Sequence, residues 1–182
     1  MRRLRGLREG DVVGIISTSS PVTPEAVDRM RCYFESRGYR VKVAPNVLAR
    51  FGFLAGSAVS RAGDLNSLLR DPDVRMVVTA MGGAGAAHLL PLADYEAFAA
   101  SPKIVVGLSN PSVLLNAMTG RTGVPTFHGP NGVEFGGLVP LTEFTESNFW
   151  ALVRGEFRIP HAFPLRDGMK VVREGPAAEG PL

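Results

Sequence analysis

The sequence predicts an α/β fold in which a mostly parallel sheet carries helices on both faces. Short apolar runs alternate along the chain with longer segments whose apolar residues have helical spacing. Most of these runs are continuously apolar, which is the pattern of strands buried on both faces. Turn residues separate the two kinds of segment. Together these observations indicate a three-layer architecture of the flavodoxin or Rossmann type.

The first half of the chain contains two predicted helices. One opens near Pro24 after a Thr/Ser/Pro loop and ends at Gly38, since glycine is common just past a helix end. The other runs from about Ser57 to Arg70 and is closed by Asp71-Pro72, because a residue before proline resists the helical conformation. Three strands are predicted around these helices, over Val12–Ile16, Arg40–Ala44 and Val74–Ala80.

The second half continues the alternation. A helix is expected behind Asn110 and Pro111, with the asparagine as N-cap and the proline as first helical residue. Residues Asn131–Pro140 indicate a glycine-rich loop, and Thr142–Val153 have the pattern of a further helix. The two remaining strands are predicted over Lys103–Gly107 and Val124–Phe127.

Composition limits the classes of function. The net charge is +3 and the arginines outside the N-terminal leader are mixed with acids, so we expect no nucleic-acid partner. The single cysteine, Cys32, is expected at the core or its boundary and suits a reducing compartment. No apolar segment is long enough to span a bilayer, and the expected location is the cytoplasm. We expect an N-terminal α/β domain over residues 1–155, and over 156–182 a linker or the start of a missing domain.

Ser109 is the first candidate for chemistry. It follows an apolar strand and precedes a helix start, which is the arrangement of a nucleophile elbow beside the positive end of a helix dipole. Serine at such a position is more often a helix cap, but Asn110 is available for that role. The surrounding residues do not follow the G-x-S-x-G pattern.

Two more loops are expected at the same sheet edge, since ligands of open α/β sheets bind beyond the carboxyl ends of the strands. Gly82, Gly83 and Ala84 form a glycine loop after the third strand, and His128 follows the fifth. The loop could donate backbone N–H groups to an oxyanion, or be a plain turn. His128 could bind substrate or be structural. Other acids and histidines fit surface, capping or boundary roles, with no spacing for a metal site: Asp64, Asp71, His88 and His161.

Several segments, taken together and in order, resemble the LD-carboxypeptidase family of serine peptidases (S66 type), which includes the microcin-immunity peptidases. The likeness covers roughly residues 7 to 155. Its motifs are Gly10-Asp11-Val12-Val13-Gly14-Ile15, Ser19-Ser20-Pro21, Phe53-Leu54-Ala55-Gly56, Arg61-Ala62-Gly63-Asp64-Leu65-Asn66, Asp71-Pro72, Gly82-Gly83, Leu89-Leu90-Pro91, Asp94-Tyr95, Pro102-Lys103, Gly107-Leu108-Ser109 and Phe127-His128-Gly129-Pro130.

The resemblance implies a Ser-His-Glu hydrolase without a cofactor. Ser109 matches the family's nucleophile, and Gly83 and Asn110 match its backbone oxyanion donors. Gly82, Ala84 and His128 are the expected substrate-binding residues. The family's glutamate and histidine belong to a C-terminal domain and have no match here. The position of Asn110 usually carries Asp in the family, and Met81 and Ala84 also depart from its pattern.

The family's substrates are the L,D-peptide bond of murein tetrapeptides or the aminoacyl-nucleotide amide of a microcin-type antibiotic. The implied partner of this chain is therefore a small peptide or peptidyl-nucleotide, and a homodimer is an option. Because the partner base is expected elsewhere, the chain alone should be weakly active or inactive. Two alternatives stay open, a non-catalytic α/β peptide- or nucleotide-binding module and a flavodoxin-like nucleotide binder.

Overall fold

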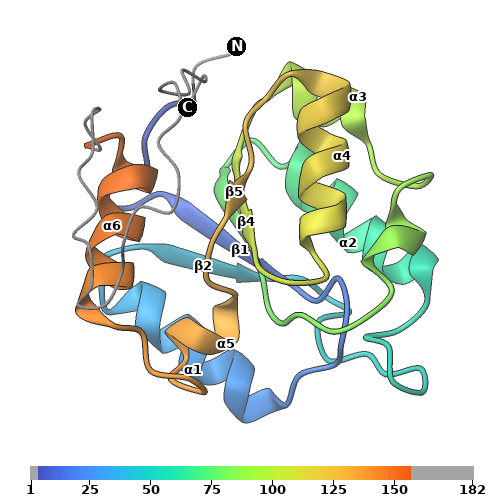
Figure 1. Cartoon of the computed structure of the whole chain (residues 1–182), viewed down its shortest axis with the longest axis horizontal. Coiled ribbons are helices and arrows are strands. Elements are labelled where there is room, and N and C mark those ends of the chain that lie inside the picture. Colours follow the sequence, from blue (N-terminus) through green and yellow to red (C-terminus); the bar gives the residue numbers. More distant parts are fainter. Residues whose placement is uncertain (1–3, 157–182) are drawn as a thin grey trace, which may run out of the picture.

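A computed structural model describes residues 4–156 of the chain. Its centre is a five-stranded sheet with the strand order β2-β1-β3-β4-β5, and every neighbouring pair is parallel. The predicted fold class is therefore confirmed (Figure 1). The strands are β1 (Val12–Ile16), β2 (Arg40–Val43), β3 (Val74–Thr79), β4 (Ile104–Gly107) and β5 (Phe127–His128).

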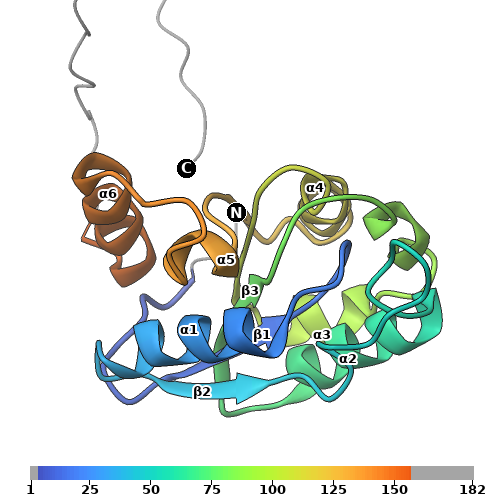
Figure 2. The ribbon, with the colours of Figure 1, turned by 90° about the horizontal axis from the view of Figure 1, so that it is seen from below.

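The helices lie on both faces of the sheet, with α1, α5 and α6 on one side and α2, α3 and α4 on the other (Figures 1 and 2). Local sequence explains several of their starts. Thr23 and Ser57 accept hydrogen bonds from backbone N–H groups in the first turns of α1 and α2, which satisfies donors that would otherwise lack partners. The helices are α1 (Pro24–Glu35), α2 (Ala58–Arg70), α3 (Tyr95–Ala100), α4 (Ser112–Thr122), α5 (Gly132–Phe135) and α6 (Glu143–Arg154), with a 3-10 turn, η1 (Ala86–Leu89).

The core has two apolar clusters, one on each face of the sheet. Side chains alternate between the faces of a strand, and β1 shows this directly. Val13 and Ile15 pack into the cluster with α1, α5 and α6, whereas Val12 and Ile16 pack into the cluster with α2, α3 and α4. Both faces of β1 are buried, which explains why its sequence is continuously apolar.

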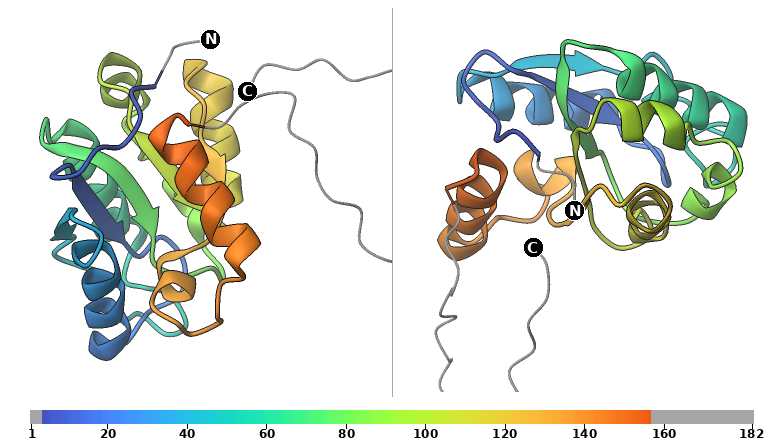
Figure 3. Two further views of the ribbon diagram at one scale, coloured as in Figure 1. Left: turned by 90° about the vertical axis from the view of Figure 1, so that its left-hand side faces the viewer. Right: turned by 90° about the horizontal axis from the view of Figure 1, so that it is seen from above.

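Helix α6 crosses the same face as α1 (Figure 3). Trp150 of α6 lies 8% exposed, and its ring stacks on Tyr39 with centroids 5.4 Å apart. Glu146 accepts a hydrogen bond of 2.5 Å from the Tyr33 hydroxyl and pairs with Arg37. These contacts attach α6 to α1 and to the residues between α1 and β2, so the segment after β5 belongs to the same core.

Several details differ from the sequence prediction. The fifth strand is Phe127–His128 and not Val124–Phe127, because only Phe127 and His128 pair with β4. Within the predicted loop Asn131–Pro140, the structure contains the short helix α5. Cys32 is exposed and not in the core or at its boundary.

Asp64 is also not the capping or solvated acid expected. It is buried and accepts hydrogen bonds from the backbone N–H and side-chain amide of Asn46. The predicted linker over 156–182 and His161 lie outside the described residues, apart from residue 156.

Candidate active site

Ser109 lies at the sharp turn between β4 and α4. Its φ is +67°, and it is the one non-glycine residue with positive φ in the described part of the chain. The left-handed region is uncommon for a serine and is often associated with functional turns. The Ser109 side chain is exposed, and its Oγ makes no hydrogen bond within residues 4–156. The turn therefore presents a free hydroxyl to solvent at the carboxyl edge of the sheet.

The glycine loop after β3 packs directly against this turn. A Cβ built on Gly82 would lie 3.1 Å from Ser109 Cβ and 3.3 Å from its Oγ, so glycine is what allows this approach. Gly83 has φ +124°, and its Cβ would lie 1.8 Å from Ser20 Oγ. A side chain at Gly83 is therefore excluded by both backbone conformation and space.

Asn110 does not cap α4 as the sequence predicted. The helix begins at Ser112, with Pro111 in the cap position and no side-chain cap. Instead, Asn110 Oδ1 accepts hydrogen bonds from Ser19 Oγ at 2.9 Å and from the Ala86 backbone N–H at 2.8 Å. One side chain thus joins the loops after β1 and β3 to the turn that carries Ser109.

The backbone N–H groups of Gly83 and Asn110 donate to no acceptor among residues 4–156. Both belong to loops that meet at Ser109. An oxyanion hole requires two such free donors that point toward one oxygen atom. Their assignment as oxyanion donors stays a prediction.

Arg61 is a part of the site that motif reasoning treated only as a family likeness. It lies on α2 and is 1% exposed. Its Nη1 donates to the carbonyl oxygens of Thr18 and Gly85, and burial lowers the pKa of the guanidinium below its ordinary value. Through these two hydrogen bonds, Arg61 connects the loop after β1 to the glycine loop after β3. A charged residue on an otherwise core-facing helix stripe is the signal that could have identified it.

Asn131 supports the other side of the turn. It is buried, and its Oδ1 accepts hydrogen bonds from Thr79 Oγ1 at 2.8 Å and from the Leu108 N–H at 3.0 Å. The residue just before Ser109 is thereby tied to β3 and to the start of α5. Sequence reasoning placed Asn131 in a loop and gave it no such role.

The other predicted binding residues lie around this centre. Ala84 is half-buried in the glycine loop, and His128 is exposed at the end of β5. Neither His128 nor His88 hydrogen-bonds Ser109 in the described structure, so no described histidine is placed as its base.

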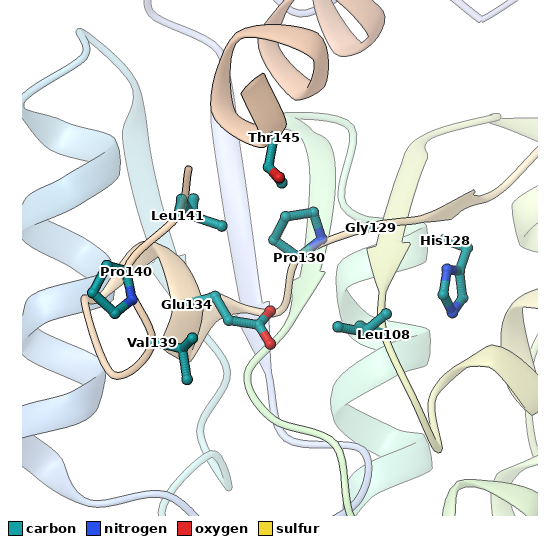
Figure 4. Close-up of a pocket in the computed structure, with 9 residues that line it drawn as sticks. All are labelled: Leu108, His128, Gly129, Pro130, Glu134, Val139, Pro140, Leu141 and Thr145. Carbon is teal, nitrogen blue, oxygen red and sulfur yellow. The ribbon is translucent and has the colours of Figure 1, made fainter. Parts of the chain in front are cut away.

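A cavity of about 310 Å³ opens next to the turn (Figure 4). A second cavity of about 300 Å³ shares His128, Gly129, Pro130 and Thr145 with it. Between residues 4 and 156 no group of three or more potential metal ligands occurs, and no helix there is long and apolar enough to cross a membrane. The turn and the cavity beside it together present a hydroxyl, backbone N–H groups and a mostly apolar hollow.

Comparison with known proteins identifies relatives with the same architecture. Residues 13–129 match the family model of the LD-carboxypeptidase N-terminal domain. A carboxypeptidase homologue of Vibrio cholerae is 36% identical over 156 residues, which are 84% of this chain and 47% of the relative. The murein tetrapeptide carboxypeptidase of Pseudomonas aeruginosa is 34% identical over 131 residues, 71% of this chain and 42% of the relative.

Solved structures agree with the sequence comparisons. The microcin C7 self-immunity protein in complex with aspartyl sulfamoyl adenosine superposes with a TM-score of 0.77 at 29% identity, over 90% of this chain and 50% of that one. This chain thus spans about half the length of the relatives it matches. With the family model covering residues 13–129, the chain belongs to the LD-carboxypeptidase family of serine peptidases.

Proposed function

We propose that this chain supplies the nucleophile-bearing part of a serine carboxypeptidase that hydrolyses an L,D-peptide bond of murein peptides or the aminoacyl-nucleotide amide of a microcin-type antibiotic. The observation that carries the proposal is the left-handed turn at Ser109, with φ +67° and an exposed hydroxyl. A strained backbone conformation persists only where the surrounding structure enforces it, and such conformations cluster at active sites. The names of the relatives supply the substrate classes.

The proposed reaction is acyl transfer through Ser109. Its Oγ attacks the amide carbonyl carbon while a general base takes the hydroxyl proton. The N–H groups of Gly83 and Asn110 stabilise the negative charge on the carbonyl oxygen. The C–N bond then breaks, and the leaving amine takes up the proton. Water hydrolyses the resulting ester and regenerates the serine.

Residues 4–156 do not supply the general base that this mechanism needs, since neither described histidine contacts Ser109. We assign this base to the C-terminal region of the relatives, which this chain does not match. The family resemblance implies the same assignment. An unactivated serine is a weak nucleophile, so the 182-residue chain alone should hydrolyse substrate very slowly.

A second candidate function is binding without catalysis. The two adjoining cavities of about 310 and 300 Å³ favour it, because they form without any further segment. A peptide or nucleotide held there would need no activated serine. This candidate predicts that ligand affinity does not depend on the Ser109 hydroxyl.

The test combines this chain with the C-terminal half of the Pseudomonas aeruginosa relative, added as a separate polypeptide. Co-elution on gel filtration reports whether the halves assemble. We expect assembled halves to release the terminal amino acid from a murein tetrapeptide, or to cleave an aminoacyl-nucleotide amide. Ser109→Ala should abolish this, and Ser112→Ala, which removes a hydroxyl on the same turn, should not. Hydrolysis that survives Ser109→Ala contradicts the proposal, and assembly with binding but no hydrolysis favours the binding module.

The proposal includes a cytoplasmic location, supported by the single cysteine and the murein-peptide relatives. Its partner is a small peptide or peptidyl-nucleotide. The homodimer implied by the resemblance is tested by light scattering of the purified chain, which distinguishes 19.4 kDa from twice that mass.

A further inference from the structure

The side-chain amide of Asn110 has one end fixed and one end free. Its Oδ1 accepts hydrogen bonds from Ser19 Oγ at 2.9 Å and from the Ala86 N–H at 2.8 Å. A backbone N–H can only donate, so the atom that it meets is the amide oxygen and the other end is Nδ2. Nδ2 donates to no acceptor among residues 4–156, and it is not one of the buried side-chain atoms there that lack a partner. An N–H2 group held in place is therefore open to solvent at the residue that follows Ser109.

The loops around Asn110 also enclose a buried cation. Arg61 is 1% exposed, and its Nη2 has no hydrogen-bond partner in the described part of the chain. Arg61 forms no ion pair with any residue between 4 and 156, and burial alone lowers its pKa. A buried guanidinium without a counter-ion is electrostatically unfavourable, so a negative charge that comes near it is stabilising.

Arg61 and Asn110 hydrogen-bond to the two ends of one peptide unit. Arg61 Nη1 donates to the Gly85 carbonyl at 2.9 Å. The N–H of the same unit, on Ala86, donates to Asn110 Oδ1, and a second connection runs through neighbouring residues of the loop after β1. Hydrogen bonds in such a chain polarise one another. The cation at one end therefore strengthens the free N–H2 group of Asn110 as a donor at the other end.

A strengthened donor near an uncompensated positive charge favours one kind of ligand group. A carboxylate accepts hydrogen bonds and carries the negative charge that these loops lack. A neutral carboxamide of the same shape offers an acceptor oxygen but no charge. An ammonium group has no acceptor for Nδ2 and would be repelled by Arg61.

We propose that Asn110 binds a carboxylate of the ligand through its side-chain amide, with Arg61 as a positioning residue that strengthens this donor. That the carboxylate belongs to the substrate attacked by Ser109 rests on the proposed function. In that substrate it would be the carboxylate of the terminal residue, next to the amide bond that is cleaved. The carboxylate preference itself requires no catalysis, so it can be measured on the 182-residue chain.

The test measures binding of two probes by titration in two-dimensional amide NMR spectra at constant ionic strength. N-acetylglycine carries a carboxylate at neutral pH, and N-acetylglycinamide replaces it by a carboxamide of similar size. We expect the carboxylate probe to bind about three- to tenfold more tightly, because a hydrogen bond to a charged acceptor is stronger than a neutral one. Among the side-chain amides, the N–H2 signals of Asn110 should shift most, and their absence from the Asn110→Asp spectrum identifies them.

Asn110→Asp is the decisive variant. Its carboxylate can accept the same two hydrogen bonds, but it has no N–H2 group and would repel the charged probe, so the ratio of the two affinities should fall to about one or below. Asn116→Asp is the matched control, because it makes the same change of charge at an exposed residue of α4, and it should keep the ratio. Asn110→Asp should also be at least as stable as the wild type in urea unfolding, since its carboxylate would compensate the charge of Arg61.

Equal affinity of the two probes for the wild-type chain, or binding of neither, overturns the proposal. A carboxylate preference that persists in Asn110→Asp, or that Asn116→Asp removes equally, also overturns it. A clear loss of stability in Asn110→Asp would overturn the role given to Arg61. A two-part assay without hydrolysis, together with a retained carboxylate preference, would contradict the proposed function alone. Hydrolysis without a carboxylate preference would contradict this inference alone.

Discussion

Replacing Ser109 by glycine should stabilise the protein while removing the proposed nucleophile. At φ +67°, a non-glycine residue carries a backbone penalty of about 1–2 kcal/mol. Glycine has no such penalty, but its greater freedom in the unfolded chain costs about 0.5–1 kcal/mol. The side chain is exposed and its hydroxyl is unbonded in the described structure, so little else is lost. The difference is a net gain of about 0–1.5 kcal/mol in the free energy of unfolding, with its centre at about 0.7 kcal/mol.

Urea unfolding followed by the fluorescence of Trp150 measures this change, because that side chain is 8% exposed in the folded state. For a chain of this size the gain corresponds to a melting temperature higher by about 2 °C. Ser109→Ala keeps the penalty and should stay within about 0.5 kcal/mol of the wild type. Ser109→Val should be less stable than both, since β-branched residues resist positive φ. A glycine variant less stable than the alanine variant would refute the argument that the turn is strained.

Three further predictions concern the loops and α6. Gly83→Ala should destabilise the protein by about 1–2 kcal/mol in urea unfolding, because its Cβ would lie 1.8 Å from Ser20 Oγ at a positive φ; wild-type stability would contradict this. Arg61→Met should lower the free energy of unfolding by about 2 kcal/mol in the same measurement, since two loop carbonyls lose their buried donor. An unchanged stability would show that these two hydrogen bonds do not hold the loops together. The hydrogen bond from Tyr33 is the main cause that lowers the pKa of Glu146. A depressed folded pKa stabilises the protein above the ordinary glutamate pKa, and this stability is lost as the pH falls through the folded value. In Glu146→Gln, the free energy of unfolding should therefore fall less steeply as the pH is lowered below about 4.5. An unchanged pH dependence would contradict the lowered pKa of Glu146.

The sheet could be predicted because its central strands are buried on both faces. Val12–Ile16 can be recognised as a strand without knowledge of the strands it pairs with, since its continuous apolar character is enough. The fifth strand is different, because Val124 is buried without belonging to the ladder. Pro125 has no N–H to donate, and pairing with β4 begins only at Phe127. In the centre of this sheet the buried residues are also the residues that pair with a neighbouring strand, whereas at its edge a residue can be buried without pairing. The local sequence pattern indicates burial alone.

The parts of the candidate site that could be predicted are the turns whose backbone conformation requires particular residue types. The glycine pair and the serine before Asn-Pro indicated two loops at one sheet edge, and the structure brings Gly82 into contact with Ser109. The structural roles of Arg61 and Asn131 could not be predicted because their hydrogen-bond partners lie far along the chain. Arg61 reaches carbonyls that are 43 and 24 residues away, and nothing in the local sequence specifies such acceptors.

Asn110 shows how a local rule can be overridden by tertiary contacts. Asparagine before proline is a good helix cap, yet both hydrogen bonds to its side chain come from other loops and end on Oδ1. An amide oxygen and a carboxylate oxygen both accept hydrogen bonds, so the aspartate that the family resemblance leads us to expect at this position could accept the same two bonds from Ser19 and Ala86. The difference is one of charge. An amide beside the proposed oxyanion donors adds no negative charge, and the developing oxyanion is therefore not repelled by this position.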